Sequence, residues 1–104
     1  MGSENFAIIQ ETTPEGVRLI IQGRVDSMNS AGLAYKLEQT IKGGQTHIVL
    51  NMLRVEYLCS IGIRAILKAY KETKAAGGKL GIEMPSECVQ NVLGTVALNE
   101  MLVE

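Results

Sequence analysis

A cysteine, a serine and an arginine lie close together in residues 59–64, which read Cys-Ser-Ile-Gly-Ile-Arg. Ser60 stands where a predicted turn over residues 55–62 gives way to an amphipathic helix. Its hydroxyl is expected to cap that helix by accepting a bond from a free backbone N–H, and a place at a chain reversal is expected to leave it reachable from solvent. The residues alone leave two roles open for Ser60, a structural cap and an acceptor of phosphate.

A phosphate on Ser60 is expected to change the surface of the protein more than its fold. The group adds about −1.5 to −2 charge and three acceptor oxygens, and the N–H groups and dipole of a helix N-terminus tolerate it. Tyr57, Ile61 and Ile63 would form a patch beside it that binds a partner. Because that partner would have to desolvate a dianion, phosphorylation is predicted to prevent binding.

Cys59 and Arg64 raise the question of an enzyme. A thiol beside a helix N-terminus can have a lowered pKa and act as a nucleophile. Phosphatase-like loops place five residues between their cysteine and their arginine, whereas four residues lie between Cys59 and Arg64. Since no general acid is apparent nearby, Cys59 is interpreted as a small buried turn residue, and no catalytic residue is predicted.

Two further groups of polar residues have structural interpretations. One group precedes an earlier helix and is expected to cap it. It consists of Asp26, Ser27, Asn29 and Ser30. The other is a run of cations on the helix after Ser60, interpreted as a solvated face that could also meet an acidic partner. It consists of Arg64, Lys68, Lys71 and Lys74.

Composition excludes several classes of function. The 104 residues suffice for one domain over 1–104, which would bury roughly 65% of the surface its unfolded chain exposes. A net charge of −1 argues against a general affinity for nucleic acid or anionic membrane. The two cysteines lie far apart, and no glycine-rich phosphate loop occurs, so no disulfide, metal or cofactor is predicted. Without a signal peptide or a long apolar run, the protein is expected in the cytoplasm and not inserted in a membrane.

Apolar periodicity predicts an α/β fold around these residues. The predicted elements in chain order are strands over 6–12 and 17–23, a helix over 28–42, a strand over 46–52, a helix ending at Gly77-Gly78, a strand over 79–84, a helix after Ser86 and an edge strand over 100–103. The first two strands are expected to form a hairpin, and the rest to form βαβ crossovers. The strand over 46–52 is apolar enough to lie in the middle of the sheet.

The order and spacing of several segments resemble the STAS domain, the fold of bacterial anti-sigma factor antagonists. The central segment, VEYLCSIGIRAILKAYKETKAAGGKL, is similar to the family's strand, its Asp-Ser-Ser-Gly or Ser-Ser-x-Gly turn and the apolar start of its next helix. Gly23-Arg24-Val25-Asp26 resembles the family's Gly-x-(Leu/Val)-Asp, and residues 92–98 resemble its closing segment. Cys59 and Ile61 depart from the family's usual residues. The resemblance implies an α/β fold with a single-layer mixed sheet covered by helices mainly on one face.

The resemblance also implies a function and a site. The form with a free Ser60 would bind an anti-sigma factor that is also a serine kinase, phosphorylation of Ser60 would end that binding, and a serine phosphatase would restore it. The loop at Asp26 would lie beside the phosphorylated turn and share a partner-binding surface with it. The residues predicted for this surface are Asp26, Ser27, Asn29, Tyr57, Cys59, Ile61, Gly62, Ile63 and Arg64.

Two other functions stay open. One keeps the fold without the switch: a constitutive docking subunit of a signalling scaffold or of a lipid transporter. The apolar character that Cys59 and Ile61 give the turn favours this alternative. The other is an enzyme that uses Cys59 as a nucleophile, and it is the least favoured because no second catalytic group accompanies the thiol.

Overall fold

The computed structural model describes residues 6–93 of the 104-residue chain. The elements within this part of the chain are β1 (Phe6–Thr12), β2 (Val17–Val25), α1 (Asn29–Lys42), β3 (His47–Leu58), α2 (Ser60–Ala75), β4 (Lys79–Glu83) and α3 (Glu87–Leu93). Each corresponds to a predicted strand or helix. The predicted edge strand over 100–103 lies outside the described residues.

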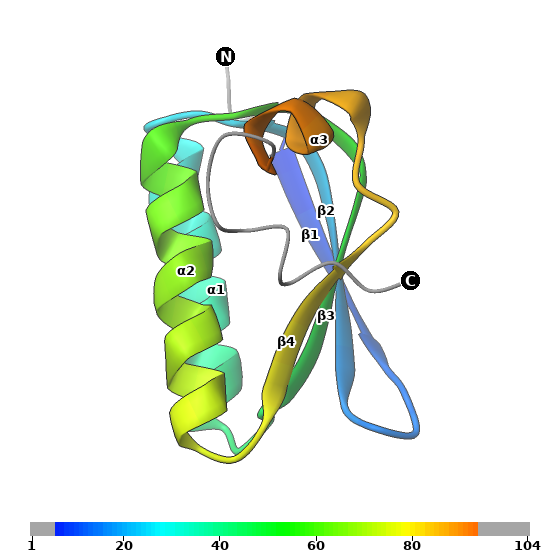
Figure 1. Ribbon diagram of the computed structural model, residues 1–104, viewed down its shortest axis with the longest axis vertical. Helices are drawn as coiled ribbons and strands as arrows, with labels where there is room; N and C mark the ends of the chain where they lie inside the picture. The colour runs from blue at the N-terminus through cyan, green and yellow to red at the C-terminus, as the bar shows by residue number, and fades with distance from the viewer. Residues whose placement is uncertain (1–5, 94–104) are drawn as a thin grey trace.

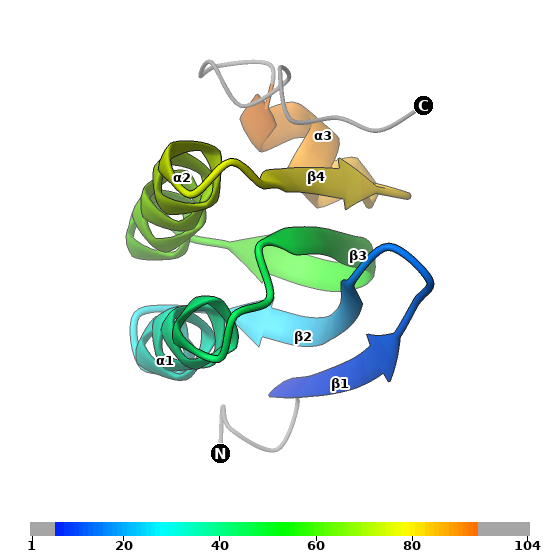
Figure 2. The ribbon, with the colours of Figure 1, turned by 90° about the horizontal axis from the view of Figure 1, so that it is seen from below.

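The strands described here form one mixed sheet in the order β1-β2-β3-β4. β1 runs antiparallel to β2, whereas β2, β3 and β4 are parallel and are connected through helices. α1 and α2 lie side by side on one face of this sheet (Figure 2). α3 lies at the end of the sheet where α2 begins (Figure 1). The predicted α/β fold, with its hairpin, its βαβ crossovers and its helices mainly on one face, is confirmed.

The hairpin turn between β1 and β2 is closed by hydrogen bonds between Thr13 and Gly16. The N–H of Thr13 donates to the carbonyl of Gly16 over 2.9 Å, and the N–H of Gly16 donates to Oγ1 of Thr13 over 3.0 Å. A side chain at Gly16 would collide with the carbonyl oxygen of His47. Glycine therefore lets this turn pack against the start of β3.

The hydrophobic core lies between the sheet and the two long helices. Alternate residues of β2 are buried, beginning with Val17, Leu19 and Ile21. Leu37 of α1 and Ile66 of α2 belong to the same cluster and are 2% and 0% exposed. Buried apolar residues thus recur at every second position along β2 and at helical spacing along α1 and α2. Each element buries one face, as the sequence pattern predicted.

β3 is longer than the sequence predicted. The predicted strand ended at Met52 and was followed by a turn over residues 55–62, but β3 continues to Leu58. Its last residues pair with the end of β2, where Val25 lies opposite Leu58. The register between β2 and β3 shifts at two points along this stretch, so the burial of β3 loses its period of two. The prediction of a turn over 55–58 is wrong because an irregular strand does not show the alternation used to recognise one.

Two other strand ends differ slightly from the prediction. β2 continues past Gly23 to Val25. β4 stops before Met84, whose φ of 50° lies in the left-handed region and cannot continue a strand. The predicted cap at Ser86 is confirmed, because its Oγ accepts the N–H of Val89 over 3.3 Å.

The face of the sheet opposite α1 and α2 carries a polar network. Arg18 of β2 pairs with Glu11 of β1, Nη1 to Oε1, over 3.2 Å and with Glu83 of β4, Nε to Oε2, over 2.8 Å. The amide of Asn51 on β3 donates to the same Glu83 oxygen over 2.9 Å. The network therefore links the four strands within residues 6–93, and we assign it a structural role in holding the sheet together.

Candidate functional site

The turn before α2 and the loop before α1 lie together at one end of the sheet. They follow the C-terminal ends of β3 and β2, which are neighbours in the sheet (Figure 1). The N–H of Cys59 donates to the carbonyl of Val25 over 3.0 Å, which ties the start of α2 to the end of β2. Two stretches of predicted site residues that are distant in the sequence are thus brought together.

Ser60 is the first residue of α2, and its side chain is exposed as predicted. The prediction that Ser60 caps the helix is wrong. The cap residue is Cys59, whose backbone is extended, with φ −86° and ψ 171°, and whose carbonyl accepts the N–H of Ile63 over 3.0 Å. A capping side chain requires the non-helical backbone that Cys59 has and Ser60 lacks. Within residues 6–93 the Ser60 hydroxyl makes no hydrogen bond, so a group attached to it would break none.

The loop before α1 is held in place by its own polar residues. Oδ1 of Asp26 accepts the N–H of Asn29 over 2.9 Å, and Oγ of Ser30 donates to the carbonyl of Asp26 over 2.6 Å. The amide of Asn29 donates to the carbonyl of Arg24 over 2.8 Å. The Asp26 carboxylate thus satisfies the N–H of the first residue of α1. The cap position itself is Met28, which makes no side-chain cap bond, so the prediction that this polar group caps the helix is only partly right. Asn29 is 7% exposed, so its side chain positions the loop, whereas Ser27 is exposed on the surface.

Cys59 is half-buried, with Sγ 3.3 Å from Oγ of Ser30. Burial is the largest single influence on the pKa of this thiol and raises it. When the thiol ionises, the Ser30 hydroxyl can turn from the Asp26 carbonyl and donate to Sγ. This hydroxyl and the backbone N–H groups of Gly62, Ile61 and Cys59 favour the thiolate and together outweigh burial, so the pKa of Cys59 is lowered. The prediction of a buried turn residue is therefore only partly right, because the thiol lies at the helix end beside a hydroxyl.

A lowered pKa gives Cys59 a larger thiolate fraction at any given pH, and this can be measured. In a Cys88→Ser variant, the pH midpoint for alkylation by iodoacetamide is expected to lie lower in the folded chain than in urea. Adding Ser30→Ala is expected to move the folded midpoint upward, because one group that favours the thiolate is lost. Equal midpoints with and without Ser30 would contradict this assignment of the shift.

Gly62 lets α2 begin close against the ends of β2 and β3. A Cβ at this position would lie 2.8 Å from Cγ1 of Val25, 2.9 Å from Cδ1 of Leu58 and 3.3 Å from Oγ of Ser30. The first two distances are shorter than carbon atoms tolerate, so any larger residue would push the helix start away from the sheet. Gly62 is buried and shapes the surface through the position of α2.

The exposed side chains around Ser60 form a mixed apolar and cationic surface. Tyr57 is 42% exposed and Ile61 49% exposed, and Arg64 is exposed as well. Ile63 is half-buried and packs against the core, so it offers less of its surface than predicted. The structure thus brings the predicted residues into one region, and their role in binding a partner stays a prediction.

Arg24 belongs to this surface, although it is not among the residues predicted for it from the sequence. Its guanidinium lies over the ring of Tyr57, 4.7 Å from the centroid. The two residues are partners in the β2–β3 register, after the second shift in that register. Because the shift cannot be located from the sequence, this contact could not be predicted.

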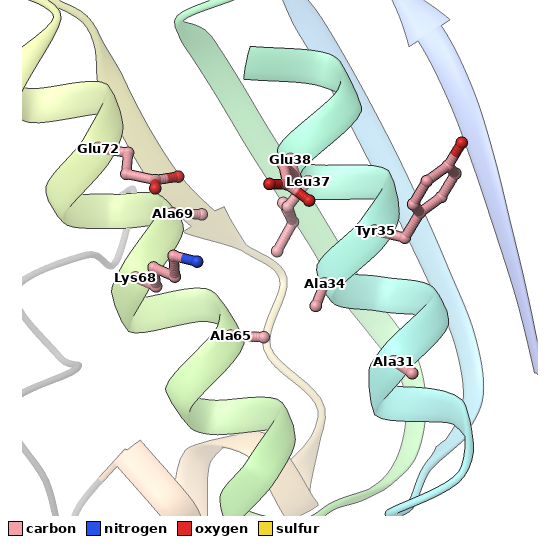
Figure 3. A pocket seen from close by; sticks show the side chains of 9 residues that line it. All are labelled: Ala31, Ala34, Tyr35, Leu37, Glu38, Ala65, Lys68, Ala69 and Glu72. Carbon is pink, nitrogen blue, oxygen red and sulfur yellow. The ribbon is translucent and has the colours of Figure 1, made fainter. Parts of the chain in front are cut away.

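A groove between α1 and α2 lies beside this surface and has a volume of about 300 Å³. Four of its nine lining residues are alanines, and Lys68 and Glu72 of α2 point towards α1 (Figure 3). No cysteine, serine, threonine or histidine lines it. Within residues 6–93, no group of three His, Cys, Asp or Glu residues could hold a metal ion, and no helix is long and apolar enough to cross a bilayer. The exposed surface around Ser60 therefore remains the candidate functional site.

The fold and the family comparison define the class of protein. A family model described as the STAS domain matches residues 7–102. Because this match covers almost the whole chain, the protein belongs to the STAS domain family, as the resemblance of its central segment indicated.

The chain is similar to a bacterial protein that is described as an anti-sigma factor antagonist. That protein is BtrV of Bordetella bronchiseptica, which is 32% identical over 60 residues. The aligned region covers 58% of this chain and 52% of BtrV, so the chain matches about half the length of that relative.

Solved structures of anti-sigma factor antagonists share the fold. The unphosphorylated form of SpoIIAA has a TM-score of 0.82 and 22% identity, with 93% of this chain and 86% of that chain covered. The phosphorylated form of SpoIIAA from Bacillus has a TM-score of 0.76 and 24% identity, with 93% and 89% covered. An anti-sigma factor antagonist from Mycobacterium paratuberculosis has a TM-score of 0.80 and 14% identity, with 95% and 84% covered. At these identities the likeness concerns the fold alone.

Proposed function

We propose that this protein is an anti-sigma factor antagonist whose binding is switched by phosphorylation of Ser60. It acts in the cytoplasm as a single domain. The form with a free Ser60 binds an anti-sigma factor that is also a serine kinase, and a serine phosphatase returns the phosphorylated form to that state. One observation carries the proposal: in a STAS-family chain, an exposed serine hydroxyl stands at the first position of α2.

The helix start can accept a phosphate without rearrangement. The carbonyl of Cys59 already accepts the first helical hydrogen bond, and the Ser60 side chain takes no part in it. Backbone N–H groups at a helix N-terminus and the positive end of the dipole stabilise an added anion. Phosphorylation therefore leaves the fold in place and changes the surface that a partner meets.

The partner surface combines Tyr57 and Ile61 with the loop at Asp26. The apolar side chains would be covered when the anti-sigma factor docks, and the phosphate would be covered with them. Removing a dianion from water costs several kcal/mol, and one exposed cation nearby offsets only part of that cost. The remaining cost is enough to prevent a complex of moderate affinity from forming. Binding therefore becomes dependent on the state of Ser60.

The test is phosphorylation by a purified anti-sigma factor that is also a serine kinase and that binds this chain. The purified chain is incubated with ATP and that kinase, and its tryptic peptides are weighed. Phosphate is expected on the peptide of residues 55–64, which contains one serine, Ser60. Ser60→Ala is expected to abolish the reaction, whereas in Ser27→Ala, at the other exposed serine of this surface, the phosphate is still expected on the peptide that contains Ser60. A kinase that binds the chain but leaves this peptide unmodified would refute the switch.

The alternative is a constitutive docking subunit with the same fold. It is favoured by the exposure of Tyr57 and Ile61, 42% and 49%, which gives the surface an apolar character independent of Ser60. Under this alternative a partner would bind the chain equally well with or without phosphate.

A further inference from the structure

Arg64 lies one helical turn beyond Ser60 on α2. The two residues are four positions apart, and both are exposed, so they share one face of the helix. Side chains of an α-helix lean towards its N-terminus. The Arg64 side chain therefore leaves the backbone in the direction of the Ser60 end of the helix, which places Ser60 within its reach.

The charge of Arg64 is not matched by an acid nearby. The ion pairs within residues 6–93 involve only the cations Arg18 and Lys42. The first turn of α2 contains no acidic residue. The next cation on the helix, Lys68, points towards α1 (Figure 3), which leaves Arg64 as the α2 cation placed to meet an anion on Ser60.

We infer that Arg64 binds the phosphate of phosphorylated Ser60 within the same helix and so prolongs the phosphorylated state. This inference rests on the proposed phosphorylation of Ser60. A phosphate offers three oxygens, and a guanidinium can donate two parallel N–H bonds to them. An anion four residues N-terminal to a cation is the more favourable order along a helix.

The ion pair has two consequences for the switch. It stabilises the dianionic form of the phosphate, so the second pKa of the phosphate, ordinarily about 6, falls. It also occupies phosphate oxygens that a phosphatase has to bind. The phosphorylated chain therefore loses its phosphate more slowly than a chain without Arg64.

Other charged and titratable groups at this end of the molecule have to be distinguished from Arg64. Arg24 on β2 is a second cation, but it lies over the Tyr57 ring. Asp26 holds the loop before α1, and Cys59 faces Ser30. Because Arg24 could reach the phosphate instead of Arg64, it is the competing explanation that the experiment must exclude.

The experiment uses the full chain with phosphoserine incorporated at position 60 during synthesis, so no kinase is needed. The phosphate is titrated by 31P NMR. Arg64→Gln is expected to raise the midpoint by about 0.5 pH unit, and Arg64→Lys by less because the charge is kept. Lys71→Gln is the matched control on α2, because Lys71 lies about 16 Å from Ser60 along the helix axis, and it is expected to leave the midpoint unchanged. Arg64→Gln is also expected to speed dephosphorylation by a broad-specificity serine phosphatase several-fold.

Three results would overturn the inference. They are an unchanged midpoint in Arg64→Gln, an equal shift in Lys71→Gln, and a larger shift in Arg24→Gln. None of them depends on the proposed function, because the phosphate is placed chemically. If the kinase leaves Ser60 unmodified, the proposed function fails, but the ion pair can still be measured. If the kinase does modify Ser60 and the phosphate titrates at the same midpoint in the wild type and in Arg64→Gln, only the ion pair fails.

Discussion

Ser60→Asp is expected to weaken binding of the anti-sigma factor by at least about 100-fold, which corresponds to about 2.8 kcal/mol. The carboxylate would stand between Tyr57 and Ile61, which are 42% and 49% exposed and would be covered by the partner. Removing a carboxylate from water costs several kcal/mol, of which the exposed Arg64 one helical turn away recovers only part. Isothermal titration calorimetry with the purified anti-sigma factor measures the loss.

The controls for Ser60→Asp separate lost docking from lost folding. An acidic residue in the first turn of a helix is favoured by the dipole, so the thermal midpoint of Ser60→Asp is expected to equal or slightly exceed that of the wild type. Ser60→Ala is expected to bind within a few-fold of the wild type. Thr12→Asp, which adds the same charge at the hairpin end of the molecule, is expected to bind normally. Wild-type affinity in Ser60→Asp would instead favour the constitutive docking subunit.

The fold was predictable because most of its elements bury one regular face. β2 alternates between buried and partly exposed residues, and Leu37 and Ile66 mark the apolar faces of α1 and α2. These periods appear directly in the sequence. The far half of β3 was missed because its pairing with β2 shifts register, and a shift depends on both strands at once.

The candidate site was predictable in its members but not in its geometry. Two features of the sequence predicted that the Ser60 hydroxyl is exposed. They are its position at the start of an amphipathic helix and the resemblance of this segment to the STAS domain. The helix boundary was missed by one residue, so the capping role passed to Cys59. The contact of Cys59 with Ser30 and that of Arg24 with Tyr57 join segments that only the folded chain brings together. Local sequence patterns contain no information about such contacts.

Ile66→Ala is expected to lower the free energy of unfolding by about 2–5 kcal/mol. Ile66 is 0% exposed and packs in the core beneath α2, so truncation leaves a cavity that the surrounding side chains fill only partly. Urea unfolding followed by circular dichroism measures the change as a lower midpoint with an unchanged slope. In urea-free buffer, the fraction of Ile66→Ala chains that stay folded is expected to keep wild-type affinity for the anti-sigma factor.

Ile61→Ala is the matched control on the same helix, and the opposite result is expected from it. Ile61 is 49% exposed, so its loss should change the free energy of unfolding by no more than about 0.5 kcal/mol. Its side chain lies beside Ser60 on the proposed partner surface, and its truncation should weaken anti-sigma factor binding about tenfold or more. A variant pair in which Ile61→Ala unfolds as readily as Ile66→Ala, yet binds normally, would mean that this end of α2 supports the fold and does not meet the partner.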